Sequence, residues 1–243
     1  MKNLFFIILS LSLWSFSNKI IGFEINTIQG TWIEESFQET LLNTGSPMAA
    51  AIAAPTYSLI EIRNLNEIQD GYFVGTLRTN FHEAGALPES SKFTQINNNT
   101  LEVTIDSNLY RFHKINLPID YYININSIAG VYKDNKGNLF DFSVTGNLFI
   151  NKKFAGTYEI FKDLTFNEHL IDCFNLYPTK NSFTIMKKTH VFFSTEKKWL
   201  TYTFAHTESG LMIYRANIEN EDIITKNTSP PLKILKRIKS HRL

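Results

Sequence analysis

The segment EHLIDC, residues 168–173, contains the residue types that a thiol enzyme uses. A cysteine nucleophile needs a base such as histidine within hydrogen-bond reach. His169 and Cys173 are four residues apart, which on a strand separates them by roughly 13 Å, so they cannot form a dyad directly. Cys173 is the only cysteine in the chain, so it cannot close an intramolecular disulfide. We interpret it as a small, buried hydrophobic residue.

Other catalytic and metal-binding signatures are incomplete. His82 and Glu83 begin like a zinc-protease helix, but Ala86 occupies the position that the second histidine must fill. No Gly-x-Ser-x-Gly motif, phosphate-binding glycine loop or paired Cys-x-x-Cys motif occurs. Three further histidines fall on separate expected strands, without metal-ligand spacing: His113, His190 and His206. We therefore predict no catalytic residues, no metal site and no cofactor.

The N-terminus has the pattern of a signal peptide over residues 1–17. Lys2 supplies a positive charge, an apolar run follows from Leu4 to Phe16, and Ser15 and Ser17 are small residues at a cleavage site. The run is shorter than the roughly 20 apolar residues that a spanning helix needs. We expect export to the periplasm or the extracellular space, without stable membrane insertion after cleavage. An uncleaved N-terminal anchor is the alternative.

The charge balance excludes one class of partner. Lys and Arg number 24 against 23 Asp and Glu, so no global field attracts nucleic acid. The only concentrated basic stretch is LKILKRIKSHRL at residues 232–243. It alternates like a strand, with Leu232, Ile234 and Ile238 on one side. We interpret it as a solvated strand and tail rather than a patch for a membrane or nucleic acid.

Alternating apolar and polar residues bounded by Asn, Asp and Gly predict an all-β protein. The strands fall into two units, residues 25–116 and 125–240, with the boundary near 116–124. In the second unit the pattern predicts strands over 148–154 and 156–161. The exception is the segment 36–57, in which Met48 to Ala54 favours a helix. Ser46 suits its N-cap, Pro47 its first position and Pro55 its end.

A phrase of eight residues opens both units. INTIQGTW at residues 25–32 returns as INSIAGVY at residues 125–132. Each copy ends in Gly-x-aromatic, which places Gly30 before Trp32 and Gly130 before Tyr132. Glycine lets a large ring fold across a closely approaching backbone, and such a ring can plug the end of a barrel.

On these residues the chain resembles lipocalin-like, or calycin, β-barrels, whose opening strand carries Gly-x-Trp. The resemblance implies two tandem antiparallel lipocalin-like β-barrels after the signal peptide. It also implies that a basic residue of the last strand stacks on the aromatic ring. Arg111 is the candidate for Trp32. For Tyr132 the candidate is Arg215, with Lys236 or Arg237 as alternatives.

The resemblance also implies a function, namely a non-catalytic carrier or sensor that holds a small apolar molecule inside a barrel. Met48 and Ile52 would then belong to a lid, or to a plug packed permanently on the barrel. The expected cavity residues are Trp32, Tyr57, Leu59, Phe73 and Phe93. The alternative is an envelope interaction module with filled barrels that binds another protein or a glycan through protruding aromatics such as Tyr121 and Tyr122.

Overall fold

The computed structural model describes residues 28–54, 56–69, 72–76, 91–162, 171–179, 200–219, 222–224 and 230–241. The predicted signal peptide, 1–17, lies outside these ranges. So do five residues weighed for chemistry: His82, Glu83, Ala86, His169 and His190. At 63–69 and 72–76 only the backbone is described, so the ligand contact predicted for Phe73 also lies outside the described side chains.

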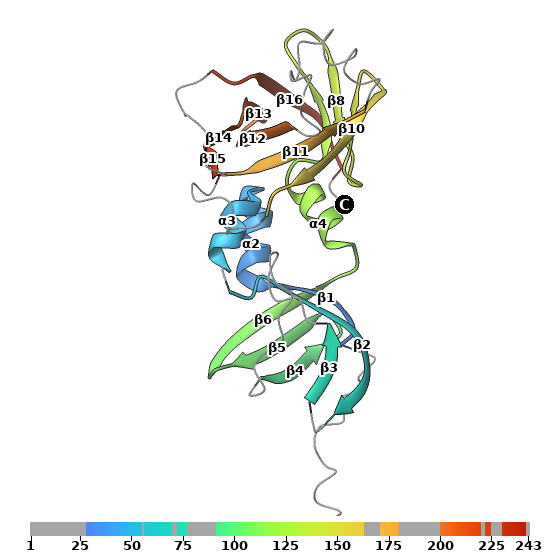
Figure 1. The fold of residues 1–243 in the computed structure, drawn as a ribbon, viewed down its shortest axis with the longest axis vertical. Helices are drawn as coiled ribbons and strands as arrows, with labels where there is room; N and C mark the ends of the chain where they lie inside the picture. The colour runs from blue at the N-terminus through green and yellow to red at the C-terminus, as the bar shows by residue number, and fades with distance from the viewer. Residues whose placement is uncertain are drawn as a thin grey trace, which may run out of the picture.

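The first unit is an antiparallel six-stranded sheet in the order β3-β2-β1-β6-β5-β4 (Figure 1). Its strands are β1 (Gly30–Glu34), β2 (Leu59–Gln69), β3 (Tyr72–Thr76), β4 (Lys92–Asn97), β5 (Thr100–Ile105) and β6 (Asn108–Ile115). The sequence predicts a closed barrel here. Among the described strands, however, β3 and β4 lie at opposite edges of the sheet, and pairing between these two edges is what closure requires.

The second unit is a closed antiparallel barrel in the order β10-β11-β12-β13-β16-β7-β8-β9. Its strands are β7 (Gly130–Lys133), β8 (Leu139–Phe142), β9 (Asn147–Ile150), β10 (Lys153–Ile160), β11 (Cys173–Pro178), β12 (Leu200–Thr207), β13 (Gly210–Arg215) and β16 (Lys233–Ser240). A separate hairpin pairs β14 (Asn217–Glu219) with β15 (Asp222–Ile224). The predicted β-barrel is therefore confirmed for this unit.

Within the described ranges, three helices modify the all-β prediction: α2 (Glu35–Thr44), α3 (Pro47–Ala53) and α4 (Ile119–Asn126). The prediction for α3 is confirmed, because the Ser46 side chain accepts a hydrogen bond from the Ala49 amide and Pro47 occupies the first turn. Helix α2 begins where the Glu34 carboxylate accepts from the Phe37 amide. It ends at Gly45, whose φ of 70° is left-handed.

The helices lie between the sheet and the barrel (Figure 1). Strand β1 is buried on both faces: Trp32 belongs to one apolar cluster on the sheet and Ile33 to another. The cluster of Ile33 continues through Phe37 of α2 and into the barrel interior. The two units therefore share one continuous core, and the second core, around Trp32, belongs to the sheet alone.

Candidate functional site

The repeated phrase produces the same local structure twice. The Trp32 indole Nε1 donates a hydrogen bond to the Ile28 carbonyl at 2.8 Å, and the Tyr132 hydroxyl donates to the Ile128 carbonyl at 2.8 Å. Both rings are fully buried. Each aromatic side chain therefore folds back four residues and satisfies a buried carbonyl of its own phrase.

The glycine of each copy is required by the backbone. Gly130 has a φ of 155°, and a Cβ there would lie 2.9 Å from the Lys239 carbonyl oxygen. Gly30 has a φ of 136°, and a Cβ there would lie 2.9 Å from the Lys114 Cε. Gly130 is therefore required both by its positive φ and by the close backbone of the last strand, whereas Gly30 is required by its positive φ, since the Lys114 side chain near it can move.

A cation covers each ring, although not the one expected. Lys114 Nζ lies 5.2 Å from the centroid of the Trp32 ring. These residues are direct register partners between β1 and β6, so their side chains share a face. Arg111, the expected partner, is three positions away, which places it on the opposite face. There it donates to Glu102 at 2.9 Å.

The cation on Tyr132 follows the same rule. Arg237 on β16 is the register partner of Tyr132 on β7, and its guanidinium carbon lies 5.1 Å from the ring centroid. Arg237 was one of the alternatives, whereas the first expected partner was Arg215. Arg215 belongs to β13, which β16 separates from β7, and its register partner is Tyr202.

The barrel interior around Phe142 is packed with aromatic rings. Phe142 contacts Tyr132, Tyr158 and Phe174 edge-on, with centroids 5.9, 5.4 and 5.9 Å away. Phe174 continues the network to Tyr202 at 5.5 Å. Burial raises the pKa of the Tyr158 phenol, so it stays neutral. This part of the interior is filled by side chains.

The structure separates the residues that the sequence analysis assigned to one apolar cavity. Trp32 is buried in the sheet core, and Tyr57 and Phe93 pack partly buried against that core. Leu59 belongs to the other cluster, on the opposite face of the sheet. The two residues of α3 differ from each other: Met48 is fully buried, and Ile52 is 47% exposed. Trp32, Tyr57 and Phe93 therefore lie together at the sheet core. Leu59, Met48 and Ile52 do not belong to that core.

Helix α3 is fastened to the barrel. The Met48 amide donates to Asp172 Oδ1 at 3.0 Å, just before β11. His206 Nε2, near the end of β12, lies 2.9 Å from the Gly45 carbonyl oxygen. Loss of hydration raises the pKa of Asp172, against the opposing effect of hydrogen bonds from the Met48 amide and the Ser46 side chain. The sequence left open whether this segment is a lid or a plug packed permanently on the barrel, and these contacts favour the plug.

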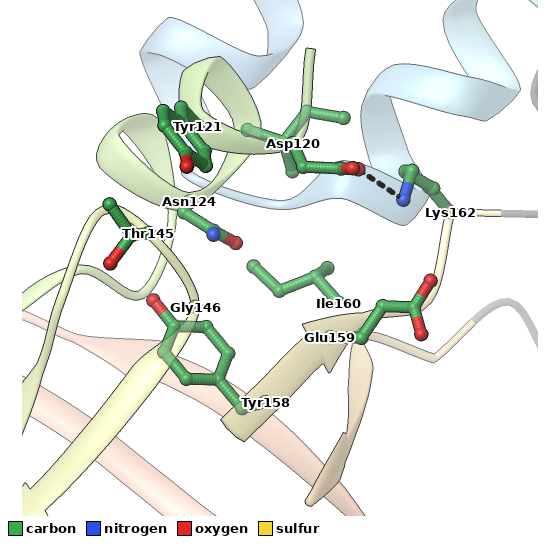
Figure 2. A pocket seen from close by; sticks show the side chains of 10 residues that line it. Asp120, Tyr121, Asn124, Thr145, Gly146, Tyr158, Glu159, Ile160 and Lys162 are labelled. Atoms are coloured by element: carbon green, nitrogen blue, oxygen red, sulfur yellow. Dashed lines mark ion pairs between the residues drawn. The ribbon is translucent and has the colours of Figure 1, made fainter. Parts of the chain in front are cut away.

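A pocket of about 160 Å³ lies between α4 and the end of β10 (Figure 2). It sits beside α4 at the junction of the two units, and Tyr158 and Ile160 of the barrel core form part of its wall. Its lining residues come from α4, from the turn after β8, and from β10 and its continuation: Asp120, Tyr121, Ile123, Asn124, Thr145, Gly146, Tyr158, Glu159, Ile160 and Lys162.

Hydrogen bonds fix the polar walls of this pocket. Asn124 Nδ2 donates to the Val144 carbonyl at 2.9 Å, and Figure 2 shows the amide directed into the space between α4 and β10. Within the described part of the chain its Oδ1 makes no hydrogen bond, so it is available as an acceptor. The Tyr158 hydroxyl donates to the Ser143 carbonyl at 2.6 Å. The amide and the phenol are therefore held in place before a ligand binds.

The charges of the pocket are unequal. Lys162 Nζ lies 2.6 Å from Asp120 Oδ1, so these two side chains neutralise each other. Glu159 accepts a hydrogen bond from the Tyr177 hydroxyl at 3.3 Å and gives the lining a net negative charge. Carboxylates, an amide oxygen and the Thr145 hydroxyl suit a neutral or positively charged ligand that is rich in hydroxyl groups.

One residue of this pocket, Tyr121, was expected from the sequence as a protruding aromatic. A role in binding was not expected for Asp120, Asn124 or Lys162. The available signal was the pair Tyr121-Tyr122 between two β units, within a segment that also contains an acidic residue and an amide. Nothing in that segment indicated that β10 lies beside it.

Comparison with known proteins identifies no relative: no protein-family model, curated protein or solved structure matches the chain. Among the described residues no group of three His, Cys, Asp or Glu side chains is placed to hold a metal ion. In the same part of the chain, no helix has the length and apolar character needed to cross a membrane.

Proposed function

We propose that this protein is an exported, non-catalytic binding module of lipocalin-like architecture that recognises a glycan through the pocket between α4 and β10. The barrel then acts as a rigid scaffold rather than a container. The observation that carries the proposal is the pre-positioned polar lining, above all the Asn124 amide, which one hydrogen bond orients with its oxygen toward the cavity.

The composition of the pocket supports a sugar over other small polar molecules. Sugar hydroxyls both donate and accept, so they match carboxylates, an amide oxygen and a hydroxyl set around one small volume. The ring of Tyr121, half-buried on α4, adds an apolar surface for the C–H face of a pyranose. Since the two carboxylates Asp120 and Glu159 outnumber Lys162, neutral and amino sugars are preferred to sialic or uronic acids.

An immobilised glycan array that includes neutral, amino and anionic sugars tests the proposal on the full chain. We expect binding to neutral or amino sugars. Glu159→Gln and Tyr121→Ala should each weaken it, with losses of about 0.5–1.5 kcal/mol for each hydrogen bond or ring contact removed. Glu208→Gln, in the exposed turn between β12 and β13, is the matched control and should bind like the wild type.

Two results contradict the proposal. One is the absence of wild-type binding to any sugar on the array. The other is equal binding by wild type and both pocket variants, which places the sugar elsewhere on the protein.

A second candidate function keeps the expectation of an apolar ligand bound by the first unit. Tyr57 and Phe93 are only partly buried against the core of Trp32, and Tyr57 packs edge-on against Tyr110 at 5.1 Å. An apolar fluorescent probe such as N-phenylnaphthylamine tests this site. Bright, saturable binding that Phe93→Ser abolishes, together with a blank glycan array, favours the carrier.

A further inference from the structure

Strand β16 inverts the usual burial of apolar and charged residues. The residues directed into the barrel include two cations, Lys233 and Arg237, whereas Ile234 and Ile238 are 62% and 56% exposed. Lys233 is compensated inside, because its Nζ lies 2.9 Å from Asp134 Oδ2. The exposure of the two isoleucines does not stabilise the barrel, because removing apolar surface from water would be favourable.

The same face carries exposed positive charge. Lys236 of β16 is the register partner of Lys133 on β7, so two lysines lie directly opposite each other on one side of the sheet. Lys239 is also exposed and pairs in register with Val131. Among the described residues, none of these three lysines forms an ion pair. A like-charged cross-strand pair is unfavourable in the isolated protein, and a negatively charged partner relieves it.

The sequence alone favours a solvated strand here over a membrane patch, but the exposed isoleucines and the opposed lysines point the other way. We propose that this β16 outer face, formed by Ile234, Lys236, Ile238 and Lys239 with Lys133, docks onto the surface of an anionic lipid bilayer. The two exposed isoleucines enter the headgroup region, and the lysines contact lipid phosphates. This mode needs only a few apolar side chains combined with basic ones.

The shape of the face favours a bilayer over a protein. A stable protein interface buries about 800 Å² on each partner, whereas this face offers two exposed isoleucines on the convex outer wall of a closed barrel. A fluid bilayer adapts to a convex surface. The proposal is independent of the glycan pocket, which is lined by residues of α4, β10 and the turn after β8.

Co-sedimentation of the full chain with vesicles tests the proposal. We expect binding to vesicles of mixed phosphatidylcholine and phosphatidylglycerol, and little binding to pure phosphatidylcholine. Raising the salt from about 0.1 M to about 0.5 M should release the protein, because screening weakens contacts between exposed charges. The double variant Lys236→Glu/Lys239→Glu should bind at least about tenfold more weakly, and Ile234→Ser/Ile238→Ser about fivefold more weakly.

The matched control changes an exposed isoleucine and an exposed lysine on the other unit, Ile96→Ser/Lys92→Glu on β4, and should bind like the wild type. All the substituted side chains are exposed, and the salt dependence of the wild type tests the proposal without any variant. Equal sedimentation with neutral and anionic vesicles overturns it. So does binding of soluble poly-glutamate without binding to vesicles, which assigns the face to acidic proteins instead.

Discussion

Replacing Tyr132 with Phe tests the aromatic anchor, because the change removes one oxygen and leaves the ring in place. That oxygen donates to the buried Ile128 carbonyl and accepts hydrogen bonds from the Arg237 guanidinium. An unpaired buried carbonyl costs about 1–3 kcal/mol, and a lost hydrogen bond to a charged group about 1.5–3 kcal/mol. Arg237 keeps its bond to the Ser127 carbonyl and its place over the ring. The two terms add to about 2.5–6 kcal/mol, and because Arg237 keeps these contacts we expect a loss in the lower part of that range, about 2.5–4 kcal/mol.

Urea unfolding followed by far-UV circular dichroism measures this loss, provided that the slope of the transition is unchanged. The matched control is Tyr214→Phe on β13, whose hydroxyl donates to the Met212 sulfur at 3.4 Å. It should change the free energy of unfolding by less than about 0.5 kcal/mol. If Tyr132→Phe is as mild as this control, the hydroxyl does not hold the opening strand, and the reasoning about the repeated phrase is wrong.

Three further changes test other parts of the fold. Lys233→Ala should cost about 1.5–3 kcal/mol in urea unfolding, because the buried Asp134 carboxylate loses its charged partner and keeps only its hydrogen bonds from Lys136 and Asn138. A smaller loss in Lys233→Ala/Asp134→Asn than in the single variant is the supporting result. Because the pKa of Asp172 is raised on folding, its ionisation opposes folding at neutral pH, and this cost disappears as the pH falls below the ordinary value for Asp. Asp172→Asn, which still accepts from the Met48 amide, should raise Tm near pH 7 but not at about pH 3.5; an equal loss of Tm at both values would refute this. Burial raises the pKa of the Cys173 thiol to about 12. The thiol should therefore resist Ellman's reagent at about pH 8 until the protein is unfolded in urea. Rapid labelling of the native protein would contradict its burial.

Local signals carried much of the fold. Alternation predicted the β character of both units, and β5, for example, buries every second residue over Thr100–Ile105. The Ser-Pro start of α3 follows from capping chemistry within four residues. The repeated phrase predicted two equivalent opening strands, and the hydrogen bonds of Trp32 and Tyr132 are equivalent. These features were predictable because each depends on residues adjacent in sequence.

Features that depend on register were not predictable in the same way. Choosing Lys114 over Arg111 requires knowing which residue of β6 lies opposite Trp32, since a shift by an odd number of positions moves a side chain to the other face. The hairpin between β9 and β10 was also misplaced. The sequence placed the break at residue 155, between strands over 148–154 and 156–161. The turn is instead at Asn151 and Lys152, both with positive φ, and residue 155 lies at a register shift between Phe154 and Gly156, inside β10.

The pocket depended on tertiary contacts. Asp120 and Asn124 belong to α4, which precedes the barrel in sequence, whereas Glu159 lies near the end of β10 and Lys162 follows it. No spacing rule relates these positions, because α4 and the end of β10 are brought together only by the tertiary fold. The filled interior is likewise a property of packing, since the alternation that marks Phe142 and Phe174 as inward-facing is the same for a packed barrel and a hollow one.

The two anchors differ in what their polar atoms offer the closing strand. The indole nitrogen of Trp32 can only donate, and its hydrogen bond goes to the Ile28 carbonyl of its own phrase. The phenol oxygen of Tyr132 donates to the Ile128 carbonyl and also accepts from the Arg237 guanidinium. One oxygen therefore ties the second copy both to its own turn and to the strand that closes the barrel, whereas the Lys114 side chain meets the first copy at the face of the indole ring.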